Sequence, residues 1–112
     1  MSDVQVLHLK NKLNEHTVNA VENDVMNLLS QGYSRIILEA EEVNSVDWPA
    51  VGKILGLKRV LRHFSGDIKV AGLPEDVKEP FNRFGACHIL EMYSNLDEAM
   101  TSFTQYADES VC

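Results

Sequence analysis

The residues best placed to do chemistry lie between Arg35 and Phe64, where an apolar strand, a short acidic loop and an amphipathic helix follow one another. The helix is predicted to begin through Asp47. At such junctions of α/β proteins, unpaired backbone amides and the positive end of the helix dipole face solvent. We therefore predict a binding surface at this junction. Its residues are Asn44, Ser45, Asp47, Trp48, Pro49, Ala50 and Lys53.

Asp47 has two chemical roles open to it at this position. Its carboxylate can accept amide hydrogen bonds as the cap of the helix, a contribution of about 1 kcal/mol. Alternatively, it can orient a phosphoacceptor or receive a basic group from a partner. No hydroxyl residue stands beside it, because Trp48 and Pro49 follow. We therefore expect capping to be its main role.

Catalytic and metal-binding patterns are weak elsewhere in the chain. Cys87 and His88 are neighbours in sequence, which does not by itself create a thiolate and base pair. The four histidines lack a metal-ligand spacing, and no glycine-rich phosphate loop is present. The acidic residues Glu39, Glu41 and Glu42 are expected to form a solvated loop rather than a metal site. We expect no catalytic residue, no cofactor and no metal.

Composition favours one compact α/β domain spanning residues 1–112, with a core of about 4–106 and a frayed tail at 107–112. The chain is 45% hydrophobic, yet no apolar run approaches the length needed to cross a bilayer. Two cysteines do not make a disulfide framework, so a cytoplasmic protein is expected. A formal net charge of −7 disfavours binding to nucleic acid.

Hydrophobic periodicity predicts alternating strands and helices. The predicted strands are Val4–Leu9, Ile36–Leu38, Ile68–Ala71 and His88–Tyr93. The first predicted helix covers 17–32, and the second carries an apolar stripe from Ala50 to Phe64. A third, short helix within 75–84 is bent or started by Pro80. The last helix follows an Asn95/Glu98 capping box and is predicted to bury Leu96, Ala99, Met100 and Phe103. This order indicates a small, mostly parallel or mixed sheet of about four to five strands with about four helices.

Basic residues concentrate on the second predicted helix, which carries Lys53, Lys58, Arg59 and Arg62 and ends near His63. One interpretation is that these cations solvate the outer face and complement the helix C-terminus. The other is that they form a basic edge that orients a partner. The sequence leaves both open.

Three segments together resemble the STAS domain of sulfate transporters and anti-sigma factor antagonists. VQVLHLKNKLNEHTVNAVENDVMNLLSQGYSRIILEAEEV is similar to the family's opening strand, a turn (here 11–14), first helix and central strand. SVDWPAVGKILGLKRVL resembles the family's Asp-Ser-Ser-Gly motif and the helix after it, with Asp47 and Gly52 matching. IKVAGLPEDVKEPFNRFGACHILEMYSNLDEAM is similar to the family's last strands and helices. An additional N-terminal strand found in many members is expected to be missing or very short here.

The resemblance implies a phosphorylation switch that this sequence does not carry at the family position. In anti-sigma factor antagonists the modified hydroxyl aligns with Pro49, and in the stressosome branch it aligns with Trp48. Three interpretations follow: Trp48 anchors a constitutively bound partner, regulation has moved to Ser45, or Trp48 only packs over the helix start while Pro49 fixes its first turn. Thr17 and Ser34 are weaker alternatives for a moved switch.

We therefore expect a noncatalytic protein-interaction module resembling bacterial anti-sigma factor antagonists in signal transduction or transcription regulation. The expected partner is an anti-sigma factor or a kinase-like ATPase domain, with no nucleic acid and no membrane insertion. Alternatives are an accessory subunit of an ABC lipid-transport complex and a domain that senses a small molecule or nucleotide. The sequence also leaves a homodimer open.

Overall fold

The computed structural model of the chain describes residues 3–83, 85–86 and 89–104. In chain order the described elements are β1 (Val4–Leu13), α1 (Val18–Ser30), β2 (Arg35–Val46), α2 (Trp48–Arg62), β3 (Asp67–Ala71), the 3-10 turn η1 (Glu75–Val77), α3 (Glu79–Arg83), β4 (Met92–Tyr93) and α4 (Leu96–Thr104). The tail at 107–112 and the Cys87–His88 pair, for which predictions were made, lie outside the described residues.

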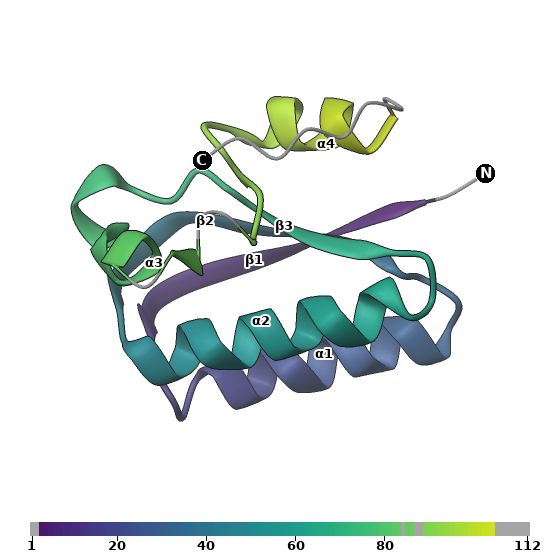
Figure 1. Cartoon of the computed structure of the whole chain (residues 1–112), viewed down its shortest axis with the longest axis horizontal. Helices are drawn as coiled ribbons and strands as arrows, with labels where there is room; N and C mark the ends of the chain where they lie inside the picture. Colours follow the sequence, from purple (N-terminus) through teal and green to yellow (C-terminus); the bar gives the residue numbers. More distant parts are fainter. Residues whose placement is uncertain (1–2, 84, 87–88, 105–112) are drawn as a thin grey trace.

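The sheet has the order β1-β2-β3-β4, and every neighbouring pair of strands is parallel. Successive strands step across the sheet in one direction, so crossovers of the same hand place α1 and α2 on the same face. Helix α4 covers the opposite face (Figure 1). The predicted α/β class with a mostly parallel sheet is confirmed.

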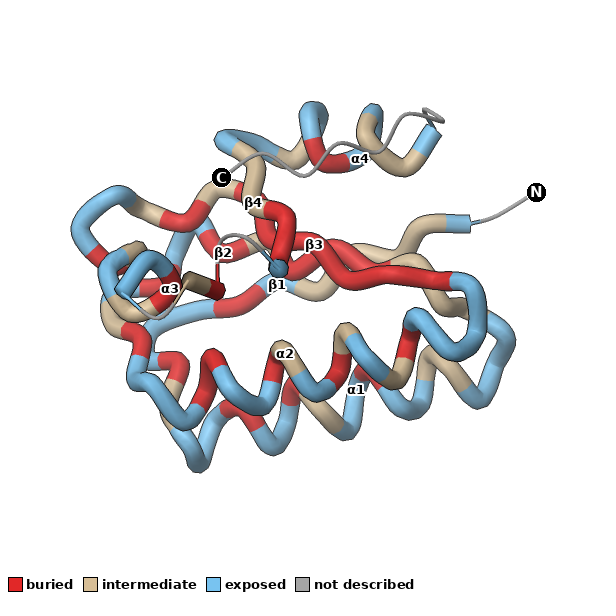
Figure 2. The backbone as a smooth tube through the Cα atoms, viewed as in Figure 1, coloured by how far each residue is buried: buried red, intermediate tan, exposed pale blue. Residues whose placement is uncertain are grey.

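Two hydrophobic clusters lie on the two faces of the sheet. Ile36 and Leu38 of β2 belong to the large cluster beneath α1 and α2, whereas Ile37 belongs to a small cluster with Ala71 and Ala99. This alternation follows from the two-residue period of a strand. Ile36, Ile37 and Leu38 are all fully buried, and the red band in Figure 2 follows the middle strands. The continuous apolar run in the sequence therefore marks a strand covered on both faces.

The predicted apolar stripe of helix α2 is confirmed except at its C-terminal end. Ala50, Ile54 and Leu57 are buried, as is Leu61, but Phe64 is 59% exposed. The helix ends at Arg62, before the stripe can continue. The following turn has the hydrogen bonds of a Schellman motif, with N–H groups donating from residue 66 to Leu61 O (2.9 Å) and from residue 65 to Arg62 O (3.1 Å).

The parallel strands β1 and β2 are longer than predicted. The acidic segment 39–42, predicted as a loop, continues β2 and pairs with β1, for example Lys10 with Glu42. The turn predicted at 11–14 is also corrected, because β1 runs to Leu13 and pairs it with Val46. The pairing of β1 with β2 is irregular in this segment, with two register shifts and a positive φ of 60° at Asn11.

The C-terminal third is close to its prediction. Pro80 is the second residue of the short helix α3, where a proline removes no hydrogen bond of the helix. The last strand is limited to Met92 and Tyr93. Asn95 Oδ1 accepts a hydrogen bond from the Glu98 amide (2.9 Å), and the Glu98 carboxylate accepts from the preceding Ser94 amide (3.3 Å). The prediction that Met100 is buried was wrong, because this residue is 38% exposed.

Candidate functional site

The predicted binding surface forms the entrance to α2, which we define as residues 44–53. Asp47 joins the strand to the helix in an extended conformation (φ −100°, ψ 152°). Its amide donates to Leu13 O at the end of β1 (3.0 Å), and its carbonyl accepts from the amides of Ala50 (3.0 Å) and Val51 (3.4 Å). The backbone of the α2 entrance is therefore fixed to two strands and to the first helical turn.

The predicted capping role of the Asp47 side chain is wrong. Asp47 occupies the N-cap position, but its side chain makes no capping hydrogen bond. A capping carboxylate bonds to the second or third amide of a helix. The second helical residue is Pro49, which has no N–H, and the amide of the third, Ala50, already donates to the Asp47 carbonyl. The carboxylate is consequently left at the surface, where Asp47 is exposed.

The side chains of the α2 entrance divide between surface and core. Trp48 is 42% exposed, and Pro49 beside it is exposed. Ala50, in contrast, is fully buried and offers no surface to a partner in this structure. Asn44 is exposed and Ser45 half-buried at the end of β2. A tryptophan, a proline and a carboxylate thus form a continuous exposed segment of the chain.

Lys53 completes the predicted set one turn further along α2. Its Nζ lies 3.5 Å from Glu22 Oε1 of α1, and both side chains are partly exposed. A pair of this kind contributes little stability in water, on the order of 0–1 kcal/mol. Lys53 can therefore exchange Glu22 for a partner carboxylate at low cost.

The carboxyl edge of the sheet next to the α2 entrance is acidic. His8 Nδ1 lies 3.2 Å from Glu39 Oε1, and the other oxygen of Glu39 accepts from the Glu41 amide (3.2 Å). These residues, with Glu42 and Asp97, line a hollow of about 440 Å³. Within the described part of the chain, no group of three or more His, Cys, Asp or Glu residues is arranged to hold a metal ion.

The outer face of α2 carries a second surface feature, a groove of about 410 Å³. It is lined by Leu55, Lys58, Arg59, Arg62, His63 and Ile89. Ile89 is 53% exposed, so the groove combines apolar side chains with a basic margin. Lys58 is held by Asp67 (Nζ to Oδ1, 2.6 Å), whereas Arg59, Arg62 and His63 are exposed. Sequence reasoning predicted the basic residues but missed Ile89. This residue lies far from α2 in sequence and meets it only in the folded chain.

A buried ionic network on the α4 face was not predicted. Lys69 Nζ lies 3.0 Å from Glu91 Oε1 and donates to Ser102 Oγ (2.7 Å), and its side chain is 2% exposed. It also lies 4.1 Å from the centroid of the Phe103 ring. Burial raises the pKa of Glu91, but hydrogen bonds from Tyr93 and Lys69 and the charge of Lys69 outweigh it, so the net pKa lies below the ordinary value. The only local signal was a lysine inside the apolar run IKVA.

Comparison with protein families matches residues 2–99 to the STAS domain. The chain therefore belongs to the STAS domain family, as its sequence resemblance implied. Comparison with curated proteins returned no match. In the described residues, no helix is long and apolar enough to span a bilayer.

Solved structures share this fold at low sequence identity. A Thermotoga maritima protein described as a candidate anti-sigma factor antagonist superposes with a TM-score of 0.79 at 22% identity, covering 89% of this chain and 88% of its own. The anti-sigma factor antagonist SpoIIAA in its unphosphorylated form gives 0.74 at 23% identity, with 88% and 86% covered. A sulfate transporter family protein of Wolinella succinogenes gives 0.75 at 13% identity, with 88% and 82% covered.

Proposed function

We propose that this chain is a noncatalytic protein-interaction module that works as an anti-sigma factor antagonist or a related signalling component. The partner is an anti-sigma factor or a kinase-like ATPase domain, and it binds at the α2 entrance and along the outer face of α2. Because such a partner regulates transcription, we propose a cytoplasmic location for the protein. Membership of the STAS family supports the general kind of protein.

The observation that carries the proposal is the exposure of Trp48. A tryptophan that leaves 42% of its surface accessible at the start of a rigid helix is a ready anchor for a partner pocket. Asp47 and Lys53 beside it supply one charge of each sign for orientation. The groove lined by Leu55 and Ile89 extends the apolar contact along the same helix.

Regulation by phosphorylation at the family position is absent in this proposal. Neither Trp48 nor Pro49 has a hydroxyl that could accept a phosphoryl group. Phosphorylation would add roughly −1.5 to −2 charges at the helix rim, where Asp47 and the neighbouring acidic edge are already negative. We infer that binding is controlled by the amounts of the competing partners instead. Ser45 is half-buried at the end of β2 and is the alternative if the switch has moved.

Affinity capture from the native cell with wild type, Trp48→Ala and Phe64→Ala tests the proposal. Phe64 is the matched control, because it is a more exposed aromatic residue beyond the other end of α2. Loss of an anchor of about 2 kcal/mol weakens binding roughly 30-fold. We expect an anti-sigma factor or kinase-like ATPase to be recovered by wild type and Phe64→Ala, and to be lost with Trp48→Ala.

Three results would count against the proposal. Equal recovery of the partner by Trp48→Ala rules out the aromatic anchor. Recovery of a transporter ATPase in place of a signalling protein favours the accessory-subunit alternative. Incubation with ATP and the captured kinase, followed by mass spectrometry, is expected to leave the protein unmodified, whereas stoichiometric phosphate on Ser45 establishes a moved switch.

A further inference from the structure

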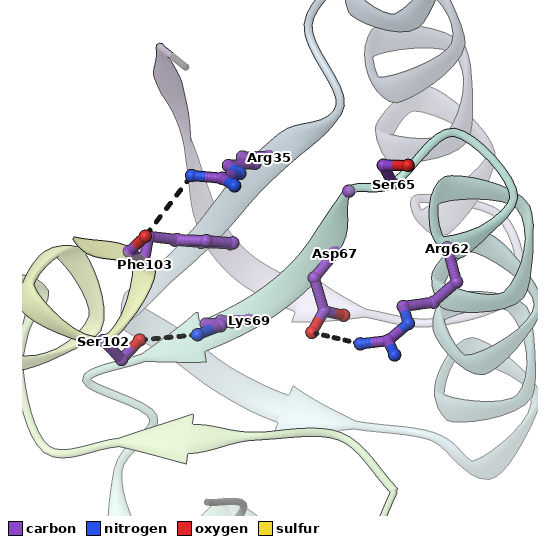
Figure 3. Close-up of a pocket in the computed structure, with 8 residues that line it drawn as sticks. Arg35, Arg62, Ser65, Asp67, Lys69, Ser102 and Phe103 are labelled. Carbon is purple, nitrogen blue, oxygen red and sulfur yellow. Dashed lines mark hydrogen bonds and ion pairs between the residues drawn. The ribbon is translucent and has the colours of Figure 1, made fainter. Parts of the chain in front are cut away.

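The amino ends of β2 and β3 border a polar hollow of about 390 Å³ at the opposite edge of the sheet from the α2 entrance. Its lining residues are Arg35, Arg62, Ser65, Gly66, Asp67, Lys69, Ser102 and Phe103. Figure 3 shows Arg35, Lys69 and Arg62 arranged around this hollow, with Phe103 on the α4 side. Since α2 has 15 residues at 1.5 Å each, the hollow is roughly 20 Å from the α2 entrance.

The charges around this hollow are opposite to those of the chain as a whole. Four cations, Arg35, Lys58, Arg62 and Lys69, stand against the two carboxylates of Asp67 and Glu91. The whole chain carries a formal charge of −7. Such a local positive excess attracts anions. The carboxyl edge, where Glu39, Glu41, Glu42 and Asp97 gather, repels them.

The individual cations differ in what they can give to a ligand. Lys69 is held by Glu91 (3.0 Å) and Ser102 (2.7 Å), so its charge is balanced within the protein and it offers no new hydrogen bond to a ligand. Arg62 is different, because its side chain is 61% exposed and its Nη1 lies a long 3.5 Å from Asp67 Oδ2. Lys58 already neutralises Asp67 at 2.6 Å. Arg62 can therefore turn its guanidinium to an anion without leaving Asp67 unpaired.

The turn between α2 and β3 adds a hydroxyl to the same hollow. Ser65 has a positive φ of 63°, a conformation that costs a non-glycine residue about 1–2 kcal/mol. A guanidinium fork and a hydroxyl are groups that proteins use to bind the oxygens of a phosphate.

We propose that this hollow, the amino-edge pocket, binds a phosphate group, either as the free dianion or as a small phosphate monoester. Arg62 supplies the bidentate contact, and the excess of cations over carboxylates around the pocket supplies the positive field. The volume of the pocket suits a phosphate with a short polar substituent, and its predominantly charged lining disfavours an apolar ligand. The site lies apart from the α2 entrance and shares only Arg62 with the groove on the outer face of α2.

Titration with inorganic phosphate, followed by amide chemical shifts in NMR at constant ionic strength, tests the site. We expect saturable shifts at residues 65–69 and 102–103 with a dissociation constant on the order of 1 mM. Arg62→Gln should weaken binding about tenfold, the loss of one charge-assisted bidentate contact. Arg59→Gln is the matched control, because it removes the same charge from the same helix but does not line the pocket. It should change affinity less than about twofold.

Equal binding by Arg62→Gln and wild type would overturn the proposal, as would equivalent shifts caused by chloride at the same ionic strength. Shifts confined to the α2 entrance would also overturn it. The circular dichroism of both variants should match wild type, because both side chains lie at the surface. A parallel titration with a small phosphate monoester separates the two sources: tighter binding than inorganic phosphate identifies the attached phosphoryl group, and weaker binding identifies the free ion.

Discussion

Replacing Glu91 with glutamine is expected to destabilise the protein strongly at neutral pH. The change leaves Lys69, whose side chain is 2% exposed, as a buried cation without its counter-charge. Breaking a buried pair in this way costs about 3–5 kcal/mol. We expect about 3 kcal/mol, because Ser102 Oγ at 2.7 Å and the Phe103 ring at 4.1 Å continue to stabilise the ammonium group. Urea denaturation followed by circular dichroism should show a midpoint lower by roughly 1–3 M.

The pH dependence of this effect provides an internal check. Because the pKa of Glu91 is lowered in the folded state, its ionised form stabilises folding above the ordinary value of 4.5. That stability is lost as the pH falls through the lowered pKa, where the carboxyl group is protonated in both states. The difference in unfolding free energy between wild type and Glu91→Gln should therefore shrink in acid. The double variant with Lys69→Met should cost less than the sum of the two single variants.

Glu79→Gln is the matched control for the same experiment. Glu79 and Arg83 form a pair at 2.6 Å, shorter than that of Glu91, but both side chains are more than half exposed. Water screens this pair, so its loss should change stability by less than about 1 kcal/mol. A cost below about 1 kcal/mol for Glu91→Gln as well, or a difference from wild type that does not shrink in acid, would refute the importance of burial in this network.

Three smaller predictions concern backbone and capping. Ser65→Gly should raise the unfolding free energy by about 0.5–1 kcal/mol in thermal denaturation, because glycine adopts the positive φ of 63° without strain; a loss of stability would contradict this. Gly66→Ala should lower it by more than about 2 kcal/mol, because a Cβ at 66 would lie 1.9 Å from the carbonyl oxygen of Ser34. Asn95→Ala should cost about 1 kcal/mol and speed amide exchange at Glu98, whose N–H loses its acceptor; unchanged exchange would argue against the cap.

Local periodicity predicted the helices and the middle of the sheet because it records which face of each element is buried. The apolar stripe from Ala50 to Leu61 is an example, and its failure at Phe64 arises where the helix has already ended. Periodicity could not predict that the acidic segment 39–42 continues β2. Such residues are poor strand formers. They are held in the strand by parallel pairing with β1, which is a long-range contact.

The α2 entrance was predicted in position but not in detail. The order of strand and helix places residues 44–53 at the carboxyl edge, and the structure keeps Trp48 and Asp47 exposed there. The capping role of Asp47 failed because two separate conditions, a proline at 49 and the amide of Ala50 already donating to the Asp47 carbonyl, remove its donors. Only the second condition requires the folded geometry, so the proline alone was a signal that could have been used.

Lys69 illustrates why ionic sites are harder to predict than helices. In the run IKVA, strand alternation places Lys69 on the face opposite Ile68 and Val70, and a polar residue there is normally solvated. It is buried because α4 returns across that face, bringing Ser102 and Phe103 over the ammonium group. Once covered, the cation requires a carboxylate, which Glu91 directly before β4 supplies. The same convergence of distant segments gives the amino edge its positive charge, whereas the acidic carboxyl edge comes mainly from the local run 39–42.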